Sequence, residues 1–64
     1  MNQIKKFRTE LKISQSTISR KANIDLRYFQ RIEKGKQFPT VYIAISLAKI
    51  LNTTVENLFC VSNP

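Results

Sequence analysis

Histidine and tryptophan are absent from this sequence, and cysteine and glycine occur once each. Without histidine, a cluster of metal ligands or a glycine-rich phosphate loop, the chain lacks the usual groups of an active site. We therefore expect no enzyme activity, no metal and no cofactor. The single cysteine, Cys60, cannot form an internal disulfide, which favours a reducing cytoplasm. No apolar run approaches the roughly 18 residues of a membrane span, and no signal peptide is recognisable.

Acidic residues are also scarce, with four Asp and Glu against eleven Lys and Arg, which gives a formal net charge of +7. Such an excess favours polyanionic partners, namely nucleic acid, an acidic protein or an anionic membrane surface. The 64 residues allow one small domain, which we expect over positions 1–64. A domain of this size buries only about 60% of its unfolded surface, so a second copy would be a natural supplement to its stability.

Periodicity and capping residues predict three short helices in the first half of the chain. Positions 2–12 carry apolar residues and an arginine at helical spacing: Ile4, Phe7, Arg8 and Leu11. Ser14 is a candidate N-cap for a helix over residues 15–22, and Asp25 for a helix over residues 26–34 that Gly35 ends. Asn23 stands between them, where a left-handed residue often ends a helix.

The second half predicts two more helices. Pro39 and Thr40 open a helix that runs to about residue 51, with a core face of Ala44, Leu47, Ala48 and Leu51. Thr53 and Glu56 have the spacing of a capping box before a short fifth helix. The fold class that follows is all-α, with five short helices and no strands.

The stretch DLRYFQRIEKG, residues 25–35, has two unlike faces when it is placed on a helix. Phe29 and Ile32 point to one side, as a core requires. The other side carries a leucine, an amide and three cations: Leu26, Gln30, Arg27, Arg31 and Lys34. A hydrophobic core does not require this second, cationic face. The cations on it therefore need another explanation.

The tight link between the second and third helices suggests that explanation. Only residues 23–25 join them, so the helices must cross steeply, and Ser19 and Ala22 are small enough for the close contact. This is the geometry of a helix-turn-helix over about residues 15–34, in which the second helix fits the major groove of DNA.

The segment ISQSTISRKANIDLRYFQRIEKGKQFPT, residues 13–40, resembles the Cro and phage-repressor type of helix-turn-helix, the XRE-like family. The matching positions are Ser14, Gln15, Ile18, Ile24, Phe29, Ile32, Glu33, Gly35, Pro39 and Thr40. The flanks IKKFR and LAKILNTTVENLF resemble the first helix and the ending of the family, so the resemblance covers almost the whole chain. It implies a compact, five-helix, lambda-repressor-like DNA-binding domain.

The resemblance also implies roles for individual residues. The positions where the family contacts bases are occupied by Leu26, Arg27, Gln30 and Arg31. The positions where it contacts phosphates are occupied by Gln15, Ser16, Lys34, Lys36 and Gln37. Arg8 and Glu33 match a pair that often forms an internal salt bridge. Two alternatives stay open, since Leu26 could instead be a buried staple and Gln15 a simple capping residue.

The fourth helix carries more apolar surface than one core face requires. Tyr42, Ile43, Ile45 and Ile50 lie beyond that face, although a tyrosine such as Tyr42 often occupies a core margin. Excess apolar surface of this kind often marks an interface. We therefore expect a two-fold homodimer whose interface includes Ile43, Ile50, Phe59 and Val61, with a monomer that has an apolar rim as the alternative.

The function implied by the resemblance is a transcriptional regulator, with repression favoured over activation. It would bind a short palindromic operator in double-stranded DNA as a homodimer, through the major groove, in the cytoplasm and at the nucleoid. No small-molecule ligand is expected. The alternatives are a protein-interaction module with a basic face, such as an antitoxin-like or regulatory partner, and a basic amphipathic peptide on a membrane surface. The second is disfavoured because capped helices and turn residues describe a packed domain.

Overall fold

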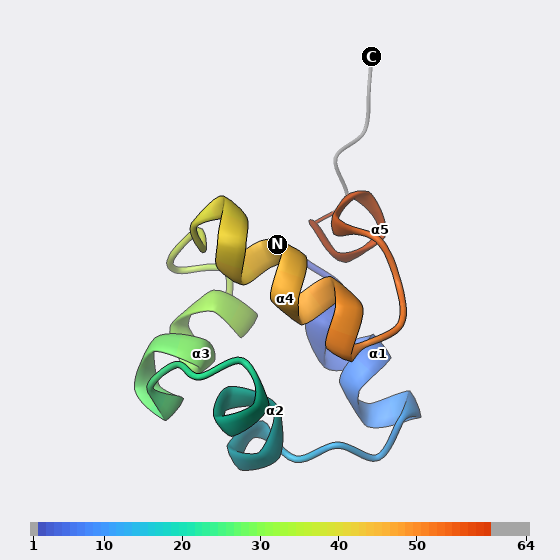
Figure 1. Cartoon of the computed structure of the whole chain (residues 1–64), viewed down its shortest axis with the longest axis horizontal. Helices are drawn as coiled ribbons and strands as arrows, with labels where there is room; N and C mark the ends of the chain where they lie inside the picture. Colours follow the sequence, from blue (N-terminus) through green and yellow to red (C-terminus); the bar gives the residue numbers. More distant parts are fainter. Residues whose placement is uncertain (1, 60–64) are drawn as a thin grey trace.

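The computed structural model describes residues 2–59, which form five helices (Figure 1). They are α1 (Ile4–Glu10), α2 (Gln15–Lys21), α3 (Leu26–Glu33), α4 (Val41–Ile50) and α5 (Val55–Phe59). The prediction of an all-α fold is confirmed over this range, which contains no strand. None of its helices has both the length and the apolar character needed to cross a bilayer. The expected interface residue Val61 lies outside the described residues.

Short polar side chains fix where three of the helices begin. Ser14 accepts a hydrogen bond from the N–H of Thr17, and Asp25 accepts one from the N–H of Arg27. Thr40 accepts from the N–H of Ile43. Each of these bonds satisfies a backbone donor that the first turn of a helix leaves unpaired.

The capping box predicted for α5 is wrong by one position. Thr54, not Thr53, accepts the hydrogen bond from the N–H of Asn57, at 3.1 Å. The Thr53 hydroxyl instead accepts from the side-chain amide of Asn57, at 3.2 Å. Two consecutive threonines leave the position of the cap ambiguous in the sequence. Glu56 has capping-box spacing from Thr53, but the observed cap is Thr54.

Four helices end in the same way, with a left-handed residue after the last turn. These residues are Lys12, Asn23, Gly35 and Asn52, with φ of 57°, 58°, 79° and 56°. After α1, for example, the N–H of Ile13 donates to the carbonyl of Arg8 and that of Lys12 to Thr9. This pair of bonds is the Schellman motif. It ends α1 at Glu10, so Leu11 lies outside the helix and is 47% exposed.

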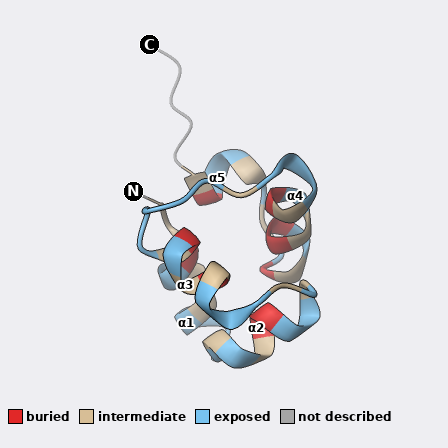
Figure 2. Cartoon of the chain, turned by 90° about the vertical axis from the view of Figure 1, so that its left-hand side faces the viewer, coloured by how far each residue is buried: buried red, intermediate tan, exposed pale blue. Residues whose placement is uncertain are grey.

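The core receives side chains from all five helices and from the C-cap of α4. Its buried members are Ile4, Ile18, Phe29, Ile32, Leu47, Ala48, Leu51 and Leu58. These buried positions face inward, while the outer faces of the helices are exposed (Figure 2). The predicted core faces of α3 and α4 are confirmed, including Ala44 at 8% exposure.

The packing of the helices leaves one side of α3 uncovered. α2 packs against α3 and α4, and α5 packs against α1 and α4 (Figure 1). Ser19 is buried in α2, with its hydroxyl donating to the carbonyl of Ser16. The side-chain amide of Asn2 donates to the carbonyl of Ile32 at 2.7 Å, which fastens the start of the chain to the last turn of α3. α3 is thus held from one side only.

Candidate nucleic-acid interface

The uncovered side of α3 carries the residues that the sequence assigned to base contacts. Leu26, Arg27 and Arg31 are exposed, while Gln30 is half-buried. Leu26 is 39% exposed, so it is not the buried staple that the sequence left open. Phe29 and Ile32 on the opposite side have no exposed surface. α3 therefore presents a cationic face with one apolar residue at its beginning.

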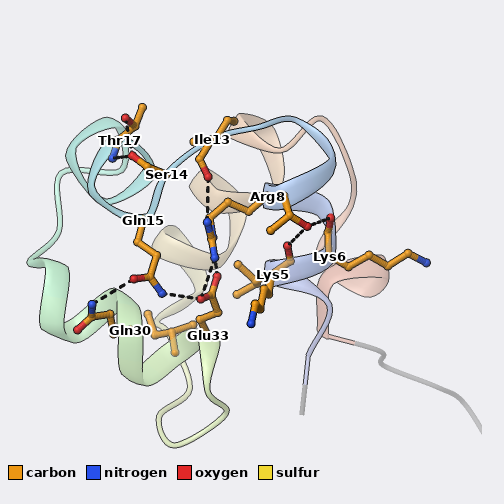
Figure 3. A network of polar contacts seen from close by, with 12 residues as sticks. Lys5, Lys6, Arg8, Ile13, Ser14, Gln15, Thr17, Gln30 and Glu33 are labelled. Atoms are coloured by element: carbon orange, nitrogen blue, oxygen red, sulfur yellow. Dashed lines mark hydrogen bonds and ion pairs between the residues drawn. The ribbon is translucent and has the colours of Figure 1, made fainter.

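A polar network holds α3 in place from behind (Figure 3). The Nε of Arg8 donates to Glu33 Oε2 at 2.7 Å, and its Nη2 donates to Glu33 Oε1 at 3.3 Å. Its Nη1 donates to the carbonyl of Ile13 at 3.0 Å. The two side chains are only 11% and 6% exposed. This ion pair, which the resemblance implied, joins α1 to the last turn of α3.

Gln15 extends the network from Glu33 to the surface. Its Nε2 donates to Glu33 Oε1 at 2.7 Å, and its Oε1 accepts from the Nε2 of Gln30 at 3.2 Å (Figure 3). Ser14 caps α2, so the reading of Gln15 as a simple cap is wrong. The first residue of α2 therefore connects the buried end of α3 to Gln30 at the margin of its exposed face.

The loop after α3 adds exposed polar residues to the same side. Gly35, with its positive φ, turns the chain, and Lys34, Lys36 and Gln37 are all exposed. The Nε of Arg31 donates to Oε1 of Gln37 at 2.9 Å. The structure thus places Gln37, for which the resemblance implied a phosphate contact, in hydrogen-bond contact with Arg31, for which it implied a base contact.

An open hollow lies where α1, α2 and α3 meet. It is lined by Lys5, Arg8, Ser14, Gln15, Glu33 and Lys34. Lys5 was not among the residues singled out from the sequence, although its i,i+3 spacing from Arg8 places both on one side of α1. Ser16 is exposed in the first turn of α2. Lys5 and Lys34 give the hollow a positive rim, since Arg8 already neutralises Glu33.

The residues expected at a dimer interface are mostly used inside the domain. Ile43, Ile50 and Phe59 are half-buried and pack against the core. Apart from Leu11 and Leu26, the exposed large apolar side chains of residues 2–59 lie just before α4 and in its first half: Phe38, Val41, Tyr42 and Ile45 are 87%, 71%, 84% and 41% exposed. We call these four residues the α4 apolar surface. The expectation that Tyr42 lies at the core margin is wrong.

The crossed pair α2–α3, the capped start of α3 and its uncovered polar face define a helix-turn-helix domain. A sequence model of the helix-turn-helix family matches residues 4–58, and the chain belongs to this family. It is similar to two uncharacterised HTH-type transcriptional regulators of Archaeoglobus fulgidus, with 27% and 29% identity over 56 residues. These alignments cover 88% of this chain and 79% and 80% of the relatives.

A solved structure with a similar fold is that of the SinR protein/SinI protein complex. The match has a TM-score of 0.77 and 27% identity, and it covers 84% of this chain. The chain spans about half of the matched chain, 53% of its length. The shared part is therefore the helix-turn-helix domain.

Proposed function

We propose that this protein is a transcriptional regulator that binds a short palindromic operator in double-stranded DNA. The observation that carries the proposal is the exposed face of α3, whose shape is fixed by the Arg8–Glu33–Gln15–Gln30 network behind it. A helix supported on one side and uncovered on the other can enter the major groove without rearrangement of the domain. The names of the two archaeal relatives agree with this function.

Specificity in this proposal comes from four residues of α3. Arg27 and Arg31 can each donate a pair of hydrogen bonds to guanine O6 and N7, a contact worth about 1–3 kcal/mol of discrimination. Leu26 can pack against the methyl group of thymine, and Gln30 can bond an adenine. Gln30 is positioned for this role by its bond to Gln15.

Affinity comes from contacts to the phosphate backbone on either side of α3. The residues proposed for these contacts are Gln15, Ser16, Lys34, Lys36 and Gln37, and the hollow adds Lys5. Neutralised phosphates release counterions, so binding falls steeply as the salt concentration rises. Occupation of an operator that overlaps a promoter is enough to repress, which is the mode we propose.

A second copy is proposed to bind at the α4 apolar surface. Ile43, Ile50 and Phe59 contribute at most their exposed edges, because they already pack in the core. The loop that leads into this surface also carries Lys36 and Gln37, so the proposed dimer interface lies next to the proposed DNA-binding face. Half-sites about 34 Å apart, one turn of DNA, would suit such a pair.

Selection of operators from a randomised duplex library tests the proposal. Wild type, Arg27→Ala and the charge-changing control Lys49→Ala are selected at two salt concentrations, since Lys49 lies at the far end of α4 from α3 (Figure 1). We expect a palindromic consensus that Arg27→Ala relaxes at one position per half-site, by about 1–3 kcal/mol. Lys49→Ala should keep the consensus.

A protein partner in place of DNA is the second candidate function, and the exposure of the α4 apolar surface favours it. Salt-sensitive binding without any enriched sequence would show that the α3 face is only a cationic surface. The interaction-module function would then replace the proposed one.

A further inference from the structure

Arg31 and Gln37 form the one side-chain hydrogen bond within residues 2–59 that joins the exposed face of α3 to the following loop. The bond runs from Nε of Arg31 to Oε1 of Gln37 and is 2.9 Å long. The loop backbone is fastened to the same turn of α3, because the N–H of Lys36 donates to the carbonyl of Arg31 at 2.9 Å. The N–H of Gly35 donates to the carbonyl of Ile32 at 3.0 Å. These two backbone hydrogen bonds fix the path of the loop just before Gln37, which places Gln37 beside Arg31.

The atoms used in this bond decide what Arg31 can still do. A guanidinium group has five N–H donors, one on Nε and two on each Nη. Gln37 takes the donor on Nε, and the four donors on the terminal nitrogens remain. Those nitrogens form the fork that fits guanine O6 and N7 end-on. The bond thus leaves the reading end of Arg31 open while it restricts the rotation of the side chain.

Arg27 provides a contrast on the same face. Its backbone N–H is bonded to Asp25, but its guanidinium makes no hydrogen bond to any group of the described part of the chain. Arg27 must therefore lose its rotational freedom when it meets DNA. Arg31 has lost part of this freedom already, and a donor that is oriented before binding loses less entropy on contact.

We propose that Gln37 is a positioning residue that orients Arg31 for end-on contact with a guanine, and that it determines specificity through Arg31. The inference rests on the proposed function, because it assigns a role within the same DNA-binding site. It replaces the phosphate contact that the resemblance implied for Gln37 and that the proposed function includes. The two roles differ in their effects: a phosphate contact strengthens binding to every sequence, whereas a positioning contact sharpens one base position.

Three variants separate these roles in the operator selection. Gln37→Met keeps the size of the side chain but removes the acceptor, and Gln37→Ala removes both. We expect each to lower the preference at the guanine position assigned by Arg31→Ala by roughly threefold to tenfold, the effect of one hydrogen bond. The base preference at the position contacted by Arg27 should not change. Gln37→Glu keeps an acceptor oxygen, so the Arg31 position should recover its preference even as overall affinity falls through the added negative charge.

Affinity for an unrelated duplex without the operator gives an independent readout. We expect the same affinity of wild type and Gln37→Met for this duplex, because no phosphate contact is lost. Equal weakening at every sequence, the unrelated duplex included, would identify a phosphate contact and overturn the inference. A Gln37→Met variant that keeps the full preference at the Arg31 position would overturn it as well.

Failure of the inference and failure of the proposed function look different. If the wild type selects no consensus, both are overturned. If the wild type selects a consensus that Gln37→Met leaves unchanged, only the role of Gln37 is lost. Nuclear magnetic resonance of the free protein adds a test without DNA, in which the Nε–H group of Arg31 should be less mobile than that of Arg27 and should loosen in Gln37→Met. Equal mobility of the two groups in the wild type would contradict the inference.

Discussion

Removal of the Glu33 carboxylate should be the most damaging single change to the polar network. This carboxylate accepts three hydrogen bonds, two from Arg8 and one from Gln15, and the Glu33 side chain is only 6% exposed. In Glu33→Ala, the guanidinium of Arg8 keeps its charge at 11% exposure and retains one bond, to the carbonyl of Ile13. The substitution therefore leaves a largely buried charge without its counter-ion.

The size of the effect follows from this burial. Breaking a buried ion pair costs about 3–5 kcal/mol, whereas an exposed pair is worth about 0–1 kcal/mol. Because Arg8 retains a small exposed area, we expect the lower end, about 3 kcal/mol. A chain of this length has a total stability of roughly 3–10 kcal/mol. The loss should lower Tm by roughly 12–24 °C, at about 4–8 °C for each kcal/mol.

Urea denaturation and thermal melting followed by circular dichroism measure this loss. Glu10→Ala is the matched control, since Glu10 is an exposed carboxylate at the end of α1 and should change stability by less than about 0.5 kcal/mol. The double variant Arg8→Met with Glu33→Leu should be more stable than Glu33→Ala, because it leaves no lone charge. A cost below about 1 kcal/mol for Glu33→Ala would refute the reasoning and class the pair with surface salt bridges.

Three further outcomes are expected from other parts of the fold. Asp25→Ala should cost about 1 kcal/mol in urea unfolding because it removes the N-cap of α3, while Asp25→Asn should be nearly neutral. Lys12→Gly should stabilise by about 0.5–1 kcal/mol because Lys12 has φ of 57°, and a smaller gain is expected for Asn23→Gly; a destabilised Lys12→Gly would contradict this account. Tyr42→Asp should shift the sedimentation coefficient toward that of a monomer without loss of helicity, whereas Leu11→Asp, at another exposed apolar residue, should leave the dimer intact. An unchanged dimer in Tyr42→Asp would show that the interface does not include the α4 apolar surface.

Helix positions were predictable because their signals are local. A cap such as Ser14 or Asp25 acts on a backbone N–H two or three residues away, so its effect can be read without knowledge of the rest of the fold. The left-handed residue Asn23 and the end of a helix at Gly35 were predicted for the same reason. Lys12 was not, because a lysine carries no preference for that conformation and only the surrounding motif imposes it.

The candidate site was predicted in part. The cationic face of α3 followed from its periodicity, since Phe29 and Ile32 fix which side is buried. The Arg8–Glu33 pair joins residues 25 positions apart, and only the family resemblance suggested it. The bond between Arg31 and Gln37 had no signal in the sequence, because it depends on the path of the loop around Gly35.

The sequence by itself determined the number, type and order of the helices, and it determined the charge of the exposed side of α3. The tertiary structure decided which apolar residues of α4 are left for a partner. Periodicity identified the core face of α4, but nearly every other position of the helix is also apolar, so the pattern does not show which of these residues stay exposed. The placement of the other helices makes that distinction: Ile43 and Ile50 pack against the core, while Val41 and Tyr42 remain exposed.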